Sequence, residues 1–158
     1  MPLDTATFRA SLSRFASGVT VLTTRSGQGH DVGMTATAFS SLSLDPPLVL
    51  VCVDRAASMA PSLEGATHLA VHVLAAGQEA LARQFALTHG DRFAGVAISR
   101  GSGEVPLIPG VLARLECRIA ERHPGGDHLI IVAEVLAAEV RDGDPLLYFR
   151  GRYSRLLP

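Results

Sequence analysis

Lysine, asparagine and tryptophan are absent from this chain of 158 residues, and all 14 basic side chains are arginine. A chain without lysine has no residue that could form a Schiff base, carry pyridoxal phosphate or supply the lysine of a P-loop. The formal net charge of -1 gives no reason to expect nucleic acid or an anionic membrane surface as a partner. These absences remove lysine-dependent enzymes and nucleic-acid-binding proteins from consideration.

Cysteines are few, and long apolar runs are missing. Cys52 and Cys117 lie in separate apolar, strand-like runs, and without a CxxC motif the sequence offers neither a thioredoxin-type site nor a cysteine pair for zinc. We expect both to be buried free thiols. Residues 1–14 contain no apolar core of signal-peptide length, and no stretch approaches the ~20 apolar residues of a membrane span. We therefore expect a cytoplasmic protein that does not act at a membrane.

The residues that are present predict a single domain over 1–158. Hydrophobic residues make up 47% of the chain and charged residues 18%, a balance that supports a buried core rather than disorder. No internal repeat and no linker would separate a second domain.

Predicted strands outnumber predicted helices. Phe8, Leu12 and Phe15 have the spacing of one helix face and predict a helix over 5–15, and residues 77–87 predict a second. Apolar and alternating runs predict strands over 19–24, 33–38, 48–53, 66–73, 111–122 and 127–141, a hairpin over 145–153 and a surface loop over 99–110. The short spacing between strands favours a mainly β, antiparallel barrel with a few short helices.

The stretch 33–53 combines small hydroxyl residues with two prolines. Thr35 and Thr37 fall on one face of a predicted strand, and a serine-rich bend and a proline turn at 45–47 follow. The run 48–53 is apolar throughout, which predicts a strand buried on both faces. Hydroxyls and main-chain N–H groups gathered at such a bend could bind a phosphate or a flat polar heterocycle. The simpler alternative is a hairpin loop that only turns the chain.

The histidines do not form a predicted metal site. His68 and His72 share one face of a strand, but four residues of extended chain separate them by about 13 Å. His123, Asp127 and His128 lie close in the sequence, yet adjacent strand residues point to opposite faces and cannot meet at one ion. We therefore expect no bound metal.

Five segments resemble the flavin reductase-like domain family, and the resemblance extends over nearly the whole chain. They are residues 15–23 (FASGVTVLT), the stretch 33–53, residues 71–74 (VHVL), the pair Arg92-Phe93 and the Gly-Asp-His motif at 126–128. The family usually has asparagine where this chain has His72, and often glycine where it has Ala133. The resemblance implies the FMN-binding split-barrel fold, a homodimer, and a reductase that serves a separate flavin-dependent monooxygenase.

The same resemblance implies roles for individual residues. His128 is expected near the point where the nicotinamide approaches the flavin, with Asp127 orienting the turn; a structural histidine at the start of a strand is the alternative. Arg92 is expected to bind the flavin phosphate, because arginine binds phosphate bidentately and no lysine is available, and a surface charge is its alternative. Tyr148 and Tyr153 are expected on the nicotinamide side.

Hydroxyl and main-chain groups are expected to hold the flavin ring and its ribityl phosphate tail. The residues expected there are Met34, Thr35, Ala36, Thr37, Ser40, Ser41, Cys52, Val53, Asp54 and Ser58, with Cys52, Val53 and Asp54 contributing backbone groups. Phe85 and Phe93 are expected to wall the pocket, with a plain core position as the alternative.

These assignments predict an NAD(P)H:flavin oxidoreductase. The nicotinamide would donate a hydride to FMN or FAD, and the cofactors themselves carry that chemistry. The alternatives are a flavin carrier of the same fold without efficient turnover and a related FMN enzyme that reduces another substrate. The sequence does not choose between FMN and FAD, or between NADH and NADPH.

Overall fold

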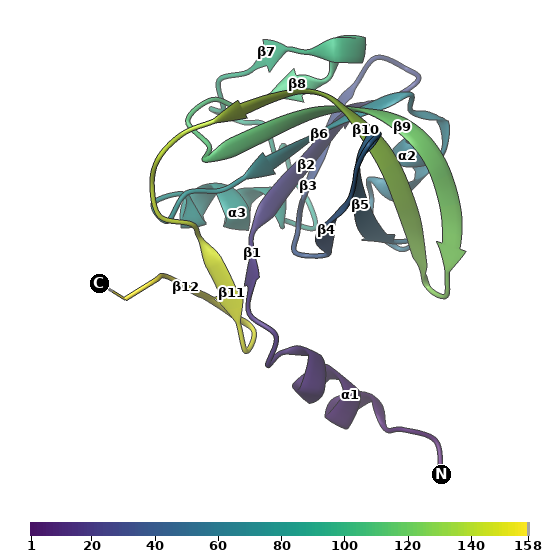
Figure 1. Ribbon diagram of the computed structural model, residues 1–158, viewed down its shortest axis with the longest axis vertical. Helices are drawn as coiled ribbons and strands as arrows, with labels where there is room; N and C mark the ends of the chain where they lie inside the picture. Colours follow the sequence, from purple (N-terminus) through teal and green to yellow (C-terminus); the bar gives the residue numbers. More distant parts are fainter. Residues whose placement is uncertain (158) are drawn as a thin grey trace.

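A seven-stranded antiparallel sheet forms the body of the protein (Figure 1). The computed structural model describes residues 1–157. The strands follow the order β3-β2-β6-β9-β10-β5-β4 across the sheet, and each neighbouring pair is antiparallel. Their bounds are β2 Thr20–Arg25, β3 Asp31–Ala36, β4 Phe39–Leu44, β5 Pro47–Asp54, β6 His68–Val73, β9 Ala113–Gly125 and β10 His128–Val140. The predicted mainly β, antiparallel fold is confirmed.

Short strands and helices surround this sheet. β1 (Ser17–Gly18), β11 (Leu147–Phe149) and β12 (Arg152–Ser154) form a small second sheet, and β7 (Ser99–Arg100) pairs with β8 (Pro106–Leu107). The helices are α1 Thr5–Leu12, α2 Ala60–Gly65, α3 Glu79–Phe85 and the 3-10 turn η1 Ser102–Glu104. Both predicted helices are present, each shorter than its periodic pattern. Within residues 1–157, no helix is long and apolar enough to cross a membrane.

Alternate residues of the strands fill the interior of the barrel. Val49, Val51 and Val53 of β5 are buried, whereas the residues between them are partly exposed. The three valines join a core that also contains buried residues of β2, β6 and β10. The prediction that the run 48–53 is buried on both faces is therefore wrong, because the outer face of β5 stays partly open to solvent in a single chain.

The barrel is split between its edge strands, β3 and β4, which follow one another in the chain. They do not pair with each other, and a short link joins them. Within the link, the Phe39 N–H donates to Thr37 O (2.9 Å) and the Cys52 N–H donates to Ala38 O (3.0 Å). The stretch 33–53 therefore crosses the seam of the barrel, where an open strand edge leaves main-chain groups without a neighbouring strand.

The serines of this stretch form a strand rather than a bend. Ser40, Ser41 and Ser43 lie in β4 and follow the register of β5, with a bulge after Ser41. The predicted serine-rich bend is wrong because the hydrogen-bonded ladder with β5 outweighs the weak local preference of serine for turns. The chain turns afterwards, at Asp45 and Pro46.

Residues 99–108 cover the outer face of β6. Val105, Leu107 and Ile108 are buried there, and Thr23 Oγ1 donates to Pro106 O (2.6 Å). The predicted surface loop is therefore wrong for the second half of this segment, whose apolar residues close a face of the sheet.

His72 is fully buried between β2 and this covering segment. The Ile108 N–H donates to Nε2 (3.0 Å), so the ring is neutral and its Nδ1–H donates to Val21 O (3.0 Å). Burial lowers the pKa of His72 to about 4. The imidazole thus joins β2 to the segment with one donated and one accepted hydrogen bond, at a position where an amide side chain could do the same.

Helix α1 lies apart from the barrel at one end of the molecule (Figure 1). None of its residues is buried. Phe8 and Leu12 are 49% and 59% exposed, and Phe15, just beyond the helix, is 83% exposed. The predicted apolar face of this helix is therefore uncovered in a single chain.

Candidate functional site

Three connected hollows form a cleft along β3, bounded by α3 and the C-terminal hairpin β11–β12. Their volumes are about 350, 220 and 630 Å³. We call them the Arg92 lobe, the Thr37 lobe and the hairpin lobe. The first two share Thr35 and Ala86, and the last two share Ala86, Tyr148 and Tyr153. The three lobes therefore make one continuous cleft, the seam cleft.

Close packing between β3 and α3 forms the inner wall of this cleft. A Cβ placed on Gly33 would lie 2.7 Å from Cε1 of Phe85, so the ring of Phe85 rests directly on the glycine. Phe93 packs edge-on against Phe85, with ring centroids 4.9 Å apart. Beside them, Thr35 Oγ1 donates to Ala82 O of α3 (2.6 Å). The close approach of Phe85 to Gly33 and the hydrogen bond from Thr35 to Ala82 O thus hold α3 against the edge strand β3.

Arg92 supplies a fixed positive charge to the Arg92 lobe. Its Nε donates to Leu87 O (2.9 Å) and its Nη1 donates to Gly33 O on β3 (2.7 Å). Among residues 1–157, none of the ion pairs involves Arg92. A guanidinium has five N–H donors, so several remain for an anion after these two bonds. The arrangement suits a phosphate group.

The loop after β5 lines the same lobe and connects it to the start of β10. Asp54 Oδ1 accepts from the Ala56 N–H (2.8 Å), and the Arg55 N–H donates to Asp127 O (2.9 Å). Ala56, together with Ala57 and Ser58, lines the Arg92 lobe. Asp127 is therefore hydrogen-bonded to Arg55, which directly precedes the cleft residue Ala56.

His128 and Asp127 form a hydrogen-bonded pair beside this loop. His128 Nδ1 lies 2.7 Å from Asp127 Oδ1, and His128 is in register with Asp54 at the end of β5. The hydrogen bond from His128 lowers the pKa of the Asp127 carboxyl. Because an ionised carboxylate only accepts, Nδ1 carries the proton and Nε2 of a neutral ring remains an acceptor. The side chain of His128 is 40% exposed, so a ligand can reach it.

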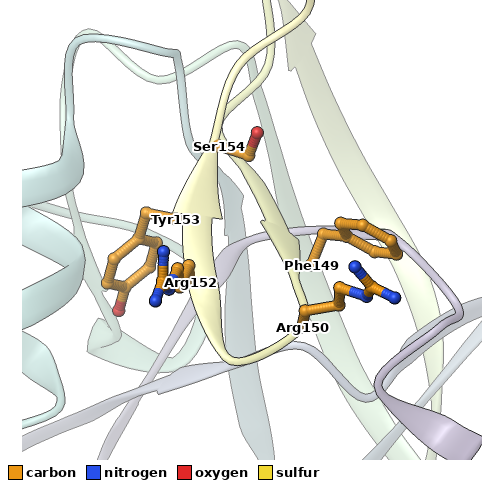
Figure 2. Close-up of a pocket in the computed structure, with 5 residues that line it drawn as sticks. All are labelled: Phe149, Arg150, Arg152, Tyr153 and Ser154. Atoms are coloured by element: carbon orange, nitrogen blue, oxygen red, sulfur yellow. The ribbon is translucent and has the colours of Figure 1, made fainter.

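The hairpin lobe is aromatic and basic. Tyr148 and Tyr153 pack edge-to-face, with centroids 5.4 Å apart, and the Arg83 guanidinium lies 4.9 Å from the centroid of Tyr153. Burial raises the pKa of Tyr153. Figure 2 shows Tyr153 and Arg152 on the α3 side of the hairpin, with Phe149 and Arg150 on the opposite side. Only the first pair belongs to the seam cleft.

Residues 12–157 match the family described as flavin reductase like domain. This chain belongs to that family. It is 45% identical over 152 residues to the FMN reductase (NADH) SmoA of Agrobacterium fabrum, which covers 96% of this chain and 86% of the relative. It is also 46% identical over 151 residues to the reductase component of 4-hydroxyphenylacetate 3-monooxygenase of Thermus thermophilus, covering 95% of both chains.

Solved flavin reductases share the fold. The NADH:FAD oxidoreductase SgcE6 of Streptomyces globisporus, in complex with NAD and FAD fragments, matches with a TM-score of 0.92 and 41% identity over 98% of this chain and 94% of that one. The flavin reductase PheA2 matches with a TM-score of 0.90 and 35% identity, over 99% of this chain and all of that one. The predicted family and its split-barrel fold are confirmed.

The seam cleft of this flavin reductase-like protein brings together many of the residues predicted to bind cofactor. They are Met34, Thr35, Ala36, Thr37, Ser58, Phe85, Arg92, Tyr148 and Tyr153. Phe85 contributes little surface, because its side chain is fully buried.

Other predicted residues lie outside the cleft. Ser40 and Cys52 line a groove of about 420 Å³, the outer groove, together with Leu12, Phe15, Thr37 and Leu50. Ser41, Val53, Asp54, Phe93, Asp127 and His128 line neither hollow; Val53 faces the barrel core and Phe93 supports Phe85. Their contact with a cofactor stays a prediction.

The prediction missed eight residues that line the cleft, and three of these have polar side chains. Thr88 lines the Arg92 lobe, and Arg83 and Arg152 line the hairpin lobe. The sequence signal for Arg152 was its place in the run Gly151-Arg152-Tyr153, beside a tyrosine already expected at the site. Arg83 carries no such signal, because only the fold brings α3 against the hairpin.

Proposed function

We propose that this protein is an NADH:flavin oxidoreductase that supplies reduced flavin to a separate monooxygenase. The observation that carries the proposal is the seam cleft, which joins a fixed guanidinium to a pair of tyrosines in a member of the flavin reductase-like family. Two of the similar proteins named above are named for NADH, SmoA as an FMN reductase and SgcE6 as an NADH:FAD oxidoreductase. NADH is therefore the expected donor here, and both flavins are candidate acceptors.

The Arg92 and Thr37 lobes fit a flavin nucleotide. The Arg92 guanidinium suits the phosphate, and the hydroxyls of Thr35 and Ser58 suit the ribityl chain. Met34 and the 47% exposed Leu87 offer apolar contact to a flat ring. When bound, the flavin supplies the hydride acceptor. The protein's own task is to hold donor and acceptor at close range and to limit access of water.

His128 is proposed as the polar contact on the nicotinamide side. Asp127 fixes the proton of His128 on Nδ1, so Nε2 can accept a hydrogen bond from an amide N–H. A carboxamide is such a donor, and NADH carries one on its reacting ring. In this role His128 orients the donor and takes no proton from it.

We further propose that two copies of the chain form a homodimer through the outer groove and α1. Leu12, Phe15 and Leu50 line the groove, and Leu42 and Leu44 on β4 are 49% and 97% exposed. These residues lie on or next to α1, on β4 and on β5, the elements through which the dimer is proposed to form. A soluble monomer rarely leaves such a surface open, and a second copy would supply a matching one. The cytoplasmic location stays a prediction from the sequence.

Nicotinamide oxidation tests the proposal. Purified protein should oxidise NADH at a rate that rises with added FMN or FAD. A protein that binds flavin tightly but consumes no NADH would instead be a carrier, and the proposal would be wrong.

A variant of Arg92 tests whether its guanidinium binds the flavin phosphate. We expect Arg92→Met to raise the Kd for FMN about tenfold, because a charge-assisted contact to phosphate is lost. The control is Arg141→Met, which removes an exposed arginine paired with Glu139, away from the cleft. Fluorescence quenching of FMN measures both constants. Equal affinities for the two variants would remove Arg92 from the site.

A further inference from the structure

The loop that carries Arg92 has few bonds to the rest of the protein. Residues 88–98 lie between α3 and β7 and contain neither helix nor strand. Within residues 1–157, every hydrogen bond that joins them to other parts of the chain involves the side chain of Arg92 or that of Gln84. Arg92 belongs to the seam cleft, whereas the function proposed above gives Gln84 no task.

Gln84 binds this loop from α3. It is partly buried and lines none of the lobes of the seam cleft. Its Nε2 donates to Arg92 O and to Ala94 O, both at 2.8 Å. Both partners are carbonyl oxygens, which only accept, so the amide turns its NH2 group toward them. One side chain thus holds the main chain on both sides of Phe93.

Asp91 closes the turn of this loop independently of Gln84. Its Oδ1 accepts from the Phe93 N–H (2.9 Å), and its main-chain O accepts from the Ala94 N–H (3.3 Å). Loss of the Gln84 amide would therefore leave the turn itself closed. What would change is the position of the turn, and with it the position of Arg92, relative to α3 and β3.

A guanidinium that is already in place binds an anion more tightly than one that is free to move. An arginine side chain loses conformational entropy when it is ordered, and binding costs less when the fold has ordered it beforehand. Arg92 is ordered by its bonds to Leu87 O and Gly33 O. Both bonds require the main chain of Arg92 at a set distance from α3 and β3, and Gln84 fixes that distance on the side of α3.

We propose that Gln84 is a positioning residue for the flavin phosphate. It acts through Arg92, whose guanidinium it keeps in place to receive the phosphate, and it does not itself contact a flavin in the seam cleft. The inference rests on the proposed flavin reductase function and adds to it a residue outside the cleft. Removing the amide should therefore weaken flavin binding only when the flavin carries a phosphate.

Titration with two flavins that differ by the phosphate tests this role. We expect Gln84→Met to raise the Kd for FMN about fivefold and to leave the Kd for riboflavin unchanged, as measured by fluorescence quenching. The control Gln78→Met removes the hydrogen bonds with the Ala75 N–H and with Gly110 O at the other end of α3, and it should change neither constant. Equal weakening of FMN and riboflavin, or an unchanged affinity for FMN, would overturn the proposal.

A double-mutant cycle shows whether Gln84 acts through Arg92. In an Arg92→Met background, Gln84→Met should leave the Kd for FMN unchanged, because no guanidinium remains to be positioned. In steady-state kinetics of the single variant, the KM for FMN should rise and kcat should not. A loss of FMN affinity in the Arg92→Met background as large as in the wild type would contradict the positioning role.

Gln84→Ala is a second variant in case the methionine variant does not fold. Alanine is the residue most favourable to a helix, and this variant should show the same selective loss of FMN affinity. Thermal unfolding of each variant identifies damage to the fold. A wild type that binds FMN but oxidises no NADH would refute the proposed function, while the two titrations would still decide this inference.

Discussion

Single residues determine the shape of the seam cleft at positions where neighbouring atoms leave no room for a larger side chain. Gly33 is the clearest case, since the ring of Phe85 occupies the volume that any side chain at this position would need. Gly27 provides a contrast in the loop before β3, because a Cβ there would meet no atom within 4 Å. The two glycines therefore predict different responses to the same substitution.

Gly33→Ala should lower the free energy of unfolding by about 1–3 kcal/mol, because the added methyl overpacks the contact between β3 and α3. Gly27→Ala should leave it nearly unchanged. Urea unfolding measures both. In a Phe85→Leu background, Gly33→Ala should cost less than it does in the wild type, and an equal cost in both backgrounds would show that the clash with Phe85 is not the cause.

His72 makes stability depend on pH. Its pKa is about 4 in the folded protein, below its ordinary value of 6.5, so the unfolded chain binds more protons between these values. The stability is fully present above about pH 6.5 and falls as the pH is lowered towards 4, by about 3 kcal/mol in all. Urea unfolding from pH 4.5 to 7.5 measures the slope, which His72→Gln should flatten. A wild type with constant stability over this range would refute the assignment.

At the scale of elements, the spacing of hydrophobic residues predicted where most strands lie. It predicted less well which faces of the strands are buried and which strands pair. The long apolar run of β5 has the composition of a strand buried on both faces, yet only alternate residues are buried. Serine at 40–43 gives no strand signal of its own and is held in β4 by pairing with β5. The same holds for Val105 and Ile108, which are buried only because the chain folds them over β6. Each of these wrong predictions concerns which part of the chain packs against a strand, and the order of apolar and polar residues does not contain that information.

The attachment of α3 to β3 can be tested through Thr35. Replacing Thr35 with valine keeps the shape but removes one of the two donors to Ala82 O, which retains the Ala86 N–H, so unfolding should be easier by about 1 kcal/mol. The Kd for FMN should also rise, because the wall of the cleft loosens. Thr35→Ser keeps the hydroxyl and is the control. A valine variant as stable as the serine variant would show that this bond does not hold the helix.

On the scale of the whole molecule, the barrel presents two hollows of different character that meet at Thr37. The seam cleft is lined by hydroxyls, three arginines and two tyrosines, whereas the outer groove and α1 are mainly apolar. The sequence placed residues of both hollows in one predicted site, since Ser40 and Cys52 are neighbours of Thr37 in the stretch 33–53. Thr37 lies in the link between β3 and β4 and borders both hollows, whereas Ser40 and Cys52 border only the outer groove, a division that the folded barrel sets.

The apolar outer groove and α1 predict that the protein forms a homodimer. Light scattering after size-exclusion chromatography should give twice the mass of one chain for the wild type. Phe15→Asp should shift the protein towards a monomer, because it places a charge in the apolar groove. The control Val140→Asp alters another exposed apolar residue, 77% exposed, that does not line the groove. A monomeric wild type, or a dimer unaffected by Phe15→Asp, would contradict the proposed interface.

Flavin binding in the seam cleft can be observed directly in a crystal of the protein soaked in FMN. We expect the flavin phosphate within hydrogen-bonding distance of Arg92 and the ring along β3, next to Thr35. Flavin bound in the outer groove beside Ser40 and Cys52, or at any other surface, would contradict it.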